Sequence, residues 1–430
     1  MKTPARPLHR FLFLSAGALA PFCSIFAQTP FAPAPPPASV AEARVVPYAP
    51  PAPVSITLKD AFKGRFVVGA AIRPDQVNGQ IPKAAELLAR EFNSITAENV
   101  MKMGPIHPRA GNDESSYRFE PADQFVEFGL KNNLFIIGHN LCWHSQMPGW
   151  MSQPDPGQSE LTKEVLMQRL KDHIFTVAGR YKGKVKGWDV VNEALADNES
   201  QQGDLPYGLR NNSPFNRLAG REYILMAFKW AHEADPDAEL YYNDYNLDAS
   251  DFKRANAIEL IKYLQGNGAR VTAVGMQGHY NFASPTTAKI DETIGMFASL
   301  GVQVHITELD IRAFADSNAA LTAAVGGVQT PPPAGQPPAG APAAAGGRGG
   351  RGPATPTPPL TPAQQEGLSK RYGEIFEVLL KHKAVTRVTF WGLRDTDSWR
   401  RQFSPLVFDD AYGRKPAYDG VIHALSKAVK

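Results

Sequence analysis

The sequence contains little cysteine. Its 430 residues include two cysteines, Cys23 and Cys142. Cys23 falls in an N-terminal segment that we expect to be removed, so Cys142 would be the one cysteine of the mature chain. One cysteine excludes an intramolecular disulfide. A chain of this length must then be stabilised by a large packed core.

Long apolar runs are also missing beyond the N-terminus. After residue 27 no stretch approaches the roughly 20 apolar residues that a membrane-spanning helix needs. Residues 1–27 carry three basic residues, then an apolar run over residues 11–26, then Ala27. This layout is typical of a secretory signal peptide. Phe22 precedes the cysteine where lipoprotein processing requires a small residue, so we expect a secreted protein, extracellular or periplasmic, without a lipid anchor.

An excess of charge of either sign is missing too. The chain has a formal net charge of +3, and the expected signal peptide holds three basic residues and no acidic residue. The mature chain should therefore be close to neutral, so nothing points to nucleic acid or a membrane as a partner. The sequence also has no Gly-rich phosphate loop, metal-ligand cluster or dinucleotide fingerprint, so we expect no cofactor and no metal.

Two segments have few large apolar side chains. Residues 28–54 are rich in Pro and Ala and predict an extended linker. Residues 315–362 combine Pro, Ala and Gly, a composition that cannot form a core, and predict a disordered insertion within one catalytic domain over residues 55–430. A linker between two domains is the alternative, but the roughly 70 residues that follow are few for a second domain. The sequence leaves the role of the insertion open.

The rest of the chain alternates short β-rich runs with helical patterns. Eight candidate strands lie at residues 65–71, 92–98, 133–141, 186–193, 238–244, 271–279, 302–310 and 387–392. Helix-length patterns lie near residues 82–91, 121–132, 160–181, 217–234, 250–266, 286–300, 363–382 and 415–428. Eight strand–helix units predict an α/β fold, a (β/α)8 TIM barrel, with a doubly wound open sheet as the alternative.

Polar residues follow seven of the eight expected strands. They are Glu98, Asn99, His139, Trp143, His144, Asn192, Glu193, Asn243, Asp244, Tyr245, Gln277, His279, Glu308, Asp310 and Trp391. In a TIM barrel the active site lies at the C-terminal ends of the strands. One polar residue there is more often a cap or a solvated side chain, but the coincidence over seven strands predicts a shared site.

Two of these residues form a carboxylate pair. Glu193 and Glu308 end the fourth and the seventh strand, on nearly opposite sides of the expected barrel mouth. Cleavage of a glycosidic bond requires one carboxyl group that protonates the departing oxygen and one carboxylate that attacks or stabilises the anomeric carbon. The pair therefore indicates glycoside hydrolysis.

Six motifs occur in a fixed order, namely TAENVMK, GHNLCWH, WDVVNEA, VGMQGHY, HITELD and TFWG. Together they resemble the signature segments of glycoside hydrolase family 10, the endo-β-1,4-xylanases, and the resemblance covers residues 55–313 and 363–428. It implies endo-acting hydrolysis of β-1,4-xylosidic bonds in xylan and xylo-oligosaccharides by a retaining double displacement. By the resemblance Glu308 is the nucleophile and Glu193 the general acid/base, and we expect a monomer.

The resemblance also implies a substrate-binding set, which is Glu98, Asn99, Lys102, His139, Trp143, Asn192, Tyr245, Gln277, His279, Trp391 and Trp399. Within it, Asn192 would contact the sugar 2-hydroxyl, and Tyr245 would line the leaving-group side. Gln277 and His279 would hydrogen-bond the nucleophile and the adjacent sugar. Without the resemblance, Lys102 would be interpreted as a solvated helix lysine.

The first three residues of the set, Glu98, Asn99 and Lys102, resemble the group that holds the next xylose on the non-reducing side. His139 and Trp143 resemble residues around the sugar at the cleavage point. Trp391 and Trp399 match an aromatic lid whose bulk leaves no space for a hydroxymethyl group, which distinguishes xylose from glucose.

Two other functions fit parts of this pattern. A retaining glycosidase acting on β-glucan or mannan would share the barrel, both carboxylates and the Asn-Glu pair. A carbohydrate-binding barrel without catalysis would require the loss of Glu193 or Glu308, and both are present.

Overall fold

The structure is a computed structural model of the 430-residue chain and describes residues 55–313 and 359–428. The expected signal peptide, the expected linker and the insertion up to residue 358 lie outside the described residues and stay predictions. Residues 359–362, at the expected end of the insertion, are described. Thr361 caps helix α13 (Pro362–Lys381), because its side chain accepts a hydrogen bond from the backbone of Gln364 and the Gln364 side chain accepts one in return.

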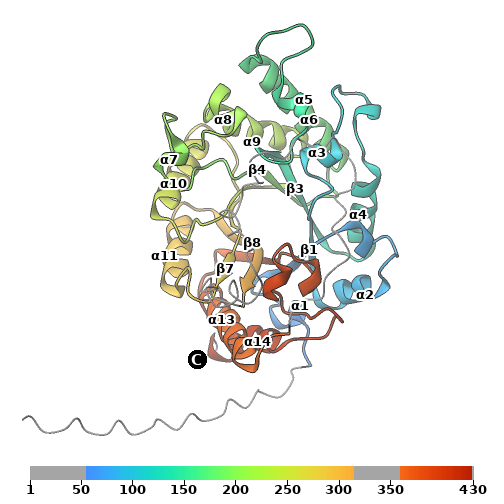
Figure 1. Ribbon diagram of the computed structural model, residues 1–430, viewed down its shortest axis with the longest axis vertical. Coiled ribbons are helices and arrows are strands. Elements are labelled where there is room, and N and C mark those ends of the chain that lie inside the picture. Colours follow the sequence, from blue (N-terminus) through green and yellow to red (C-terminus); the bar gives the residue numbers. More distant parts are fainter. Residues whose placement is uncertain (1–54, 314–358, 429–430) are drawn as a thin grey trace, which may run out of the picture. The chain divides into compact units, whose positions relative to one another are not determined.

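Eight parallel strands close into a barrel (Figure 1). They are β1 (Val67–Ile72), β2 (Ser94–Ala97), β3 (Phe135–Trp143), β4 (Gly187–Asn192), β5 (Glu239–Asp244), β6 (Ala273–Met276), β8 (Gln303–Arg312) and β9 (Val385–Phe390). Each strand pairs with the next along the chain, β6 pairs with β8, and β9 pairs with β1. The short strand β7 (His279–Asn281) adds to β8. The TIM barrel is confirmed, and the closure excludes the open sheet.

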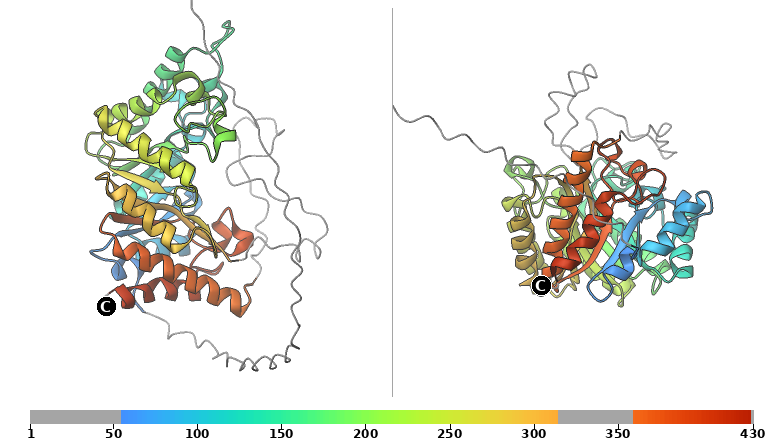
Figure 2. Two further views of the ribbon diagram at one scale, coloured as in Figure 1. Left: turned by 90° about the vertical axis from the view of Figure 1, so that its left-hand side faces the viewer. Right: turned by 90° about the horizontal axis from the view of Figure 1, so that it is seen from below.

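Long helices follow the strands and surround the barrel (Figures 1 and 2). Besides α13 they are α2 (Pro82–Glu91), α4 (Glu120–Lys131), α6 (Lys163–Arg180), α9 (Glu222–Ala234), α10 (Asp251–Gly266), α11 (Thr287–Ala298) and α14 (Pro416–Ala428). They match the predicted helical stretches with one difference. The stretch 217–234 is broken at Gly220, whose φ of 55° ends the short helix α8 (Pro214–Ala219).

The amphipathic pattern explains why the helices pack on the barrel. In α11 the buried residues are Ile290, Thr293, Ile294 and Phe297, which lie on one side of the helix. In the described parts of the chain, no helix has both the length and the apolar character needed to cross a membrane.

The interior of the barrel is filled at the end opposite the active-site loops. Ile137, Tyr241 and Ala273 form a small buried cluster. Arg387 on β9 donates a hydrogen bond to the Tyr241 hydroxyl on β5 at 2.8 Å. Because β5 and β9 are not neighbours in the sheet, this contact crosses the barrel. Side chains fill this end of the barrel. The space for a ligand lies at the other end, where the strands have their C-termini, as expected for this fold.

Candidate active site

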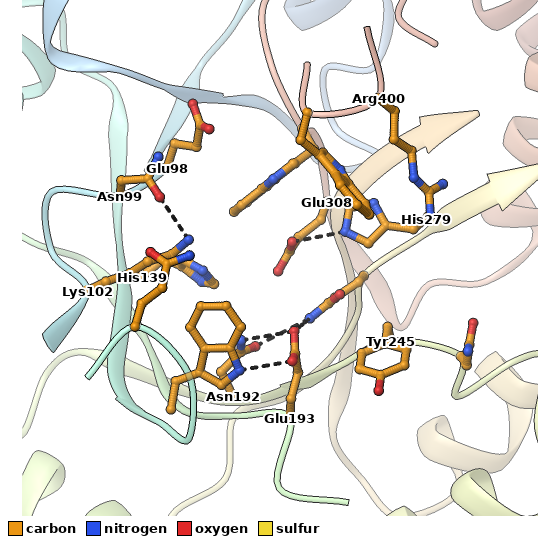
Figure 3. A pocket seen from close by; sticks show the side chains of 16 residues that line it. Glu98, Asn99, Lys102, His139, Asn192, Glu193, Tyr245, His279, Glu308 and Arg400 are labelled. Carbon is orange, nitrogen blue, oxygen red and sulfur yellow. Dashed lines mark hydrogen bonds and ion pairs between the residues drawn. The ribbon is translucent and has the colours of Figure 1, made fainter. Parts of the chain in front are cut away.

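A pocket of about 300 Å³ opens at the C-terminal ends of the barrel strands (Figure 3). Its lining residues are Glu98, Asn99, Lys102, His139, Trp143, Gln146, Asn192, Glu193, Tyr245, Asn246, Gln277, His279, Glu308, Trp391, Trp399 and Arg400. Every residue of the predicted catalytic and substrate-binding sets is among them. The closed barrel therefore brings together residues that lie up to 302 positions apart in the sequence, Glu98 and Arg400.

Glu193 stands directly after β4, where the chain leaves the strand. Its φ of 56° is left-handed, a conformation that non-glycine residues rarely adopt and that often occurs at active sites. Oε2 accepts a hydrogen bond from the indole Nε1 of Trp143 at 2.9 Å. Oε1 accepts from Nε2 of Gln277 at 2.9 Å and from Nδ2 of Asn192 at 3.3 Å. These donors fix both carboxylate oxygens of a side chain that is 7% exposed.

Glu308 lies within β8, next to an irregularity in the pairing of β8 with β9. Its Oε1 accepts a hydrogen bond from Nδ2 of Asn243 at 2.8 Å. The same nitrogen donates to Oδ1 of Asn192 at 2.8 Å, and the Thr307 hydroxyl donates to Oδ1 of Asn243 at 2.6 Å. Asn243 therefore links Glu308 to the residue beside Glu193. The sequence placed Asn243 at a strand end but gave it no role.

His279 connects Glu308 to a second carboxylate. Its Nε2 lies 3.2 Å from Oε2 of Glu308, and its Nδ1 lies 3.1 Å from Oδ1 of Asp310. Burial alone would lower the pKa of His279, but the charge of Asp310 and the hydrogen bonds to Asp310 and Glu308 raise it to about 9. Asp310 is itself held by Nη1 of Arg400 and Nε1 of Trp399, each at 2.9 Å. At neutral pH a protonated imidazole therefore stands beside Glu308.

The hydrogen bonds of Gln277 differ from those that the resemblance implied. It was expected to hydrogen-bond the nucleophile together with His279, but its amide donates to Glu193 and, at 3.4 Å, to Oδ1 of Asn192. The amide that contacts Glu308 belongs to Asn243 instead. Gln277 follows β6, which pairs directly with β8, yet the amide that reaches Glu308 comes from Asn243 on β5.

Glu98, Asn99 and Lys102 lie together at one end of the pocket in Figure 3. Nζ of Lys102 donates to Oδ1 of Asn99 at 3.0 Å and lies 5.1 Å from the centre of the Trp143 ring. Lys102 is 6% exposed, which excludes a solvated helix lysine. Its burial lowers its pKa, although the charges of Glu308, Glu98 and Glu193 oppose the shift.

Aromatic rings form other walls of the pocket. Trp391 is buried and packs edge to face with His139, with the ring centres 5.2 Å apart. Trp399 is 43% exposed. Flat apolar surfaces beside a dense set of amides and carboxylates suit a ligand with C–H faces and many hydroxyl groups, which is the chemistry of a carbohydrate.

Comparison with known proteins decides the family. The family model for glycosyl hydrolase family 10 matches residues 57–424. The chain belongs to glycosyl hydrolase family 10. It is therefore an enzyme of the glycoside hydrolase class, which excludes the carbohydrate-binding barrel without catalysis.

Two relatives of this family 10 hydrolase are similar over nearly their whole length. The β-1,4-xylanase of Dictyoglomus thermophilum is 38% identical over 370 residues, which is 84% of this chain and 89% of the relative. Endo-1,4-β-xylanase B of Paenibacillus barcinonensis is 35% identical over 376 residues, covering 85% and 97%.

Solved structures show the same similarity. A family 10 endoxylanase from a sugarcane soil metagenome superposes with a TM-score of 0.70 at 36% identity, covering 85% of this chain and 98% of that chain. An intracellular xylanase of Thermoanaerobacterium saccharolyticum, solved as a mutant with xylotriose, has a TM-score of 0.69 at 31% identity and the same coverage.

Three lining residues of the family 10 hydrolase were missed from the sequence. Gln146 and Asn246 have φ values of 49° and 56°, so their backbone turns them toward the pocket in a way that residue types do not reveal. Arg400 follows Trp399 and reaches the pocket through its contact with Asp310. The position of Arg400 directly after Trp399 is the sequence signal that points to it.

Within residues 55–313 and 359–428, no group of three or more His, Cys, Asp or Glu side chains has an arrangement that could hold a metal ion. The chemistry that the described side chains offer is proton transfer and nucleophilic attack by carboxyl groups.

Proposed function

We propose that this family 10 hydrolase is an endo-1,4-β-xylanase that cleaves xylan with retention of configuration. Glu308 is the nucleophile and Glu193 the general acid/base. The observation that carries the proposal is the position of the two carboxyl groups in one pocket, joined through Asn192 and Asn243. The names of the relatives, and the xylotriose bound to one of them, support xylan as the substrate.

In the first step an ionised Glu308 attacks the anomeric carbon while Glu193 gives its proton to the departing glycosidic oxygen. The bond to that oxygen breaks, and an ester forms between Glu308 and the sugar. Asn243 donates to Oε1 of Glu308, and protonated His279 contacts Oε2. Both contacts hold the carboxylate in place for the attack.

In the second step Glu193 acts as a base. It takes a proton from a water molecule, the water oxygen attacks the anomeric carbon, and the ester to Glu308 breaks. Two inversions at the same carbon give net retention. Asn192, which contacts Glu193 and Asn243, is in position to hydrogen-bond the sugar 2-hydroxyl in both steps.

The other pocket residues contact different parts of the bound substrate. Glu98, Asn99 and Lys102 hold the xylose on the non-reducing side, and His139 and Trp143 line the sugar at the cleavage point. Tyr245 lines the leaving-group side. Trp391 and Trp399 form the lid, and their bulk favours xylose because it carries no hydroxymethyl group.

A covalent trap tests the mechanism. A 2-fluoro xylobioside with a good leaving group should leave a stable adduct on the peptide that contains HITELD, because the fluorine slows breakdown of the ester. Mass spectrometry locates the adduct. An adduct on another peptide, or an inverted product, would contradict a retaining enzyme with Glu308 as nucleophile. A crystal structure should place the two carboxyl groups roughly 5 to 5.5 Å apart.

A substrate comparison tests the specificity. Xylan should be hydrolysed much faster than cellulose or mannan under the same conditions. Similar rates on all three polysaccharides would favour a glycosidase of broader specificity on the same barrel.

We further propose that the enzyme is secreted as a monomer after removal of residues 1–27. The proposal is motivated by the three basic residues and the apolar run of that segment. N-terminal sequencing of the exported protein should begin at Gln28, and light scattering should give the mass of one chain.

A further inference from the structure

A buried cluster of charged side chains surrounds Lys253 on α10. Lys253 is 0% exposed, although lysine is almost never fully buried without partners. Its Nζ lies 2.9 Å from Oδ1 of Asp197, 2.7 Å from Oδ1 of Asp244 and 3.3 Å from the centre of the Tyr245 ring. The three N–H groups of the ammonium therefore face two carboxylates and one aromatic ring.

The same cluster holds Tyr245 at further points. The Tyr245 hydroxyl donates to Oδ2 of Asp197 at 2.8 Å and accepts from Nη2 of Arg210 at 3.1 Å. The backbone N–H of Tyr245 donates to Oδ1 of Asp244 at 2.9 Å. Burial raises the pKa of Tyr245 above its usual range, so the hydroxyl keeps its proton and remains a donor. Asp197 and Asp244, which make two of these contacts, also pair with Lys253.

The charges of the cluster balance. Lys253 and Arg210 supply two positive charges, and Asp197 and Asp244 supply two negative charges. His144, which accepts a hydrogen bond from Arg210, stays neutral because burial and the charges of Arg210 and Lys253 lower its pKa to about 3. Removal of Lys253 would leave two neighbouring carboxylates without their shared cation. Their repulsion would separate Asp197 from Asp244, and both contact Tyr245.

The position of Tyr245 connects the cluster to the substrate. Figure 3 shows Tyr245 and the group of Glu98, Asn99 and Lys102 on opposite sides of Glu193. A sugar chain with its non-reducing part at Lys102 therefore has its departing sugar at Tyr245. Lys253 does not line the pocket, and the lining residue that its ammonium contacts is Tyr245.

We propose that Lys253 is a positioning residue for the departing sugar. It fixes the ring of Tyr245, against which the leaving sugar packs during cleavage and the incoming sugar packs during transfer. The inference rests on the proposed xylanase activity. It predicts a loss confined to reactions in which a sugar occupies the leaving-group side.

Two substrates separate this role from the chemistry at Glu308. Xylotriose releases a xylose that must pack on Tyr245, whereas β-xylobiosyl fluoride releases a fluoride ion that contacts little on that side. In Lys253→Met, kcat/KM for xylotriose should fall on the order of tenfold, and the value for β-xylobiosyl fluoride should stay within about twofold. Lys262→Met is the matched control, because Lys262 lies on the same helix and forms an exposed ion pair with Glu259.

A product ratio gives a second readout. Xylobiose added to the fluoride reaction competes with water for the glycosyl-enzyme, and Lys253→Met should shift the products from transfer toward hydrolysis. A displaced Glu193 would slow attack by water and by xylobiose alike and leave this ratio unchanged. An unchanged ratio therefore overturns the proposal, and so does an equal loss on xylotriose and β-xylobiosyl fluoride.

A second variant covers the case that Lys253→Met does not fold. Asp197→Ala removes the acceptor of the Tyr245 hydroxyl at a side chain that is 21% exposed, and it keeps the pair of Lys253 with Asp244. It should show the same selective loss on xylotriose, and a uniform loss or no loss overturns the proposal. The unsubstituted enzyme is assayed first. If it hydrolyses neither substrate, the proposed xylanase function fails, independently of Lys253.

Discussion

Nε2 of His279 lies 3.2 Å from Oε2 of Glu308, close enough for the protonated ring to hold the carboxylate in place. The pKa of His279 is raised to about 9, above the ordinary value of 6.5. A group with a raised pKa in the folded state binds its proton more tightly there than in the unfolded chain. Its contribution to stability is complete below pH 6.5 and is lost as the pH rises through about 9.

The first prediction follows from this shift. The melting temperature should fall between pH 7 and pH 10, and the fall should be smaller in His279→Gln, which has no proton to lose. Thermal unfolding of both proteins over this range measures the difference. Parallel curves for the two proteins would show that His279 is not the group that titrates.

The second prediction concerns proton transfer by Glu193. Glu193→Ala should lower kcat on xylan by about 10² to 10⁴, because the departing sugar oxygen needs a proton. Release of dinitrophenolate from the corresponding xylobioside in the first turnover should be nearly unaffected, since this leaving group needs none. Pre-steady-state kinetics measures the burst.

Asn192→Ala is the comparison for that experiment. Its contact with the sugar 2-hydroxyl serves both leaving groups, so both substrates should become slower in this variant. If Glu193→Ala slows the dinitrophenolate burst as much as it slows xylan hydrolysis, Glu193 has no selective acid role.

The third prediction compares a crowded glycine in the sheet with an uncrowded glycine in a helix. A Cβ added at Gly138 would lie 2.1 Å from Cε3 of the buried Trp188, its neighbour across β3 and β4. Gly138→Ala should therefore lower the free energy of unfolding by about 1–3 kcal/mol. Gly295 on α11 has nothing within 4 Å of an added Cβ, so Gly295→Ala should stabilise the helix by up to about 1 kcal/mol. Denaturant unfolding measures both, and similar values for the two variants would contradict the packing argument.

The fourth prediction concerns the Pro-, Ala- and Gly-rich insertion. Its composition cannot bury much apolar surface, so replacing residues 320–358 with a short Gly-Ser linker should leave the melting temperature nearly unchanged. Cleavage of xylotriose should also survive, because a short substrate fits within the pocket. A loss confined to long xylan would indicate that the segment contacts the rim of the cleft. Unfolding of the barrel, or loss of xylotriose cleavage, would contradict the disordered insertion.

The sequence predicted the barrel because its signals are periodic. Eight short apolar runs alternate with amphipathic helical patterns, and polar residues follow seven of the runs. The closure of β9 on β1, which excludes the open sheet, is seen only in the structure. Most of the residues that line the pocket followed from the strand ends and the family resemblance, but Gln146, Asn246 and Arg400 did not. The individual hydrogen bonds between the pocket side chains did not follow from the sequence, because they depend on backbone torsion angles.

Two residues illustrate the limit. The φ of 56° at Glu193 and the irregular pairing beside Glu308 decide which amide reaches which carboxylate. A strand-end pattern contains neither feature, so Gln277 was assigned to the wrong glutamate and Asn243 received no role. The residue types identify most members of the site. The local backbone conformation determines which of these side chains hydrogen-bond to each other.

The closure of β9 against β1 and β8 has a practical consequence, because residues 314–358 separate β8 from α13 in the sequence. A gene divided within that region would encode two polypeptides, one with both carboxylates and one with Trp391, Trp399 and Arg400. The smaller polypeptide would carry α13, β9 and α14, and its strand would fit between two strands of the larger one. Xylan hydrolysis would then require their association, so the enzyme could serve as a split reporter for proteins fused to the two halves.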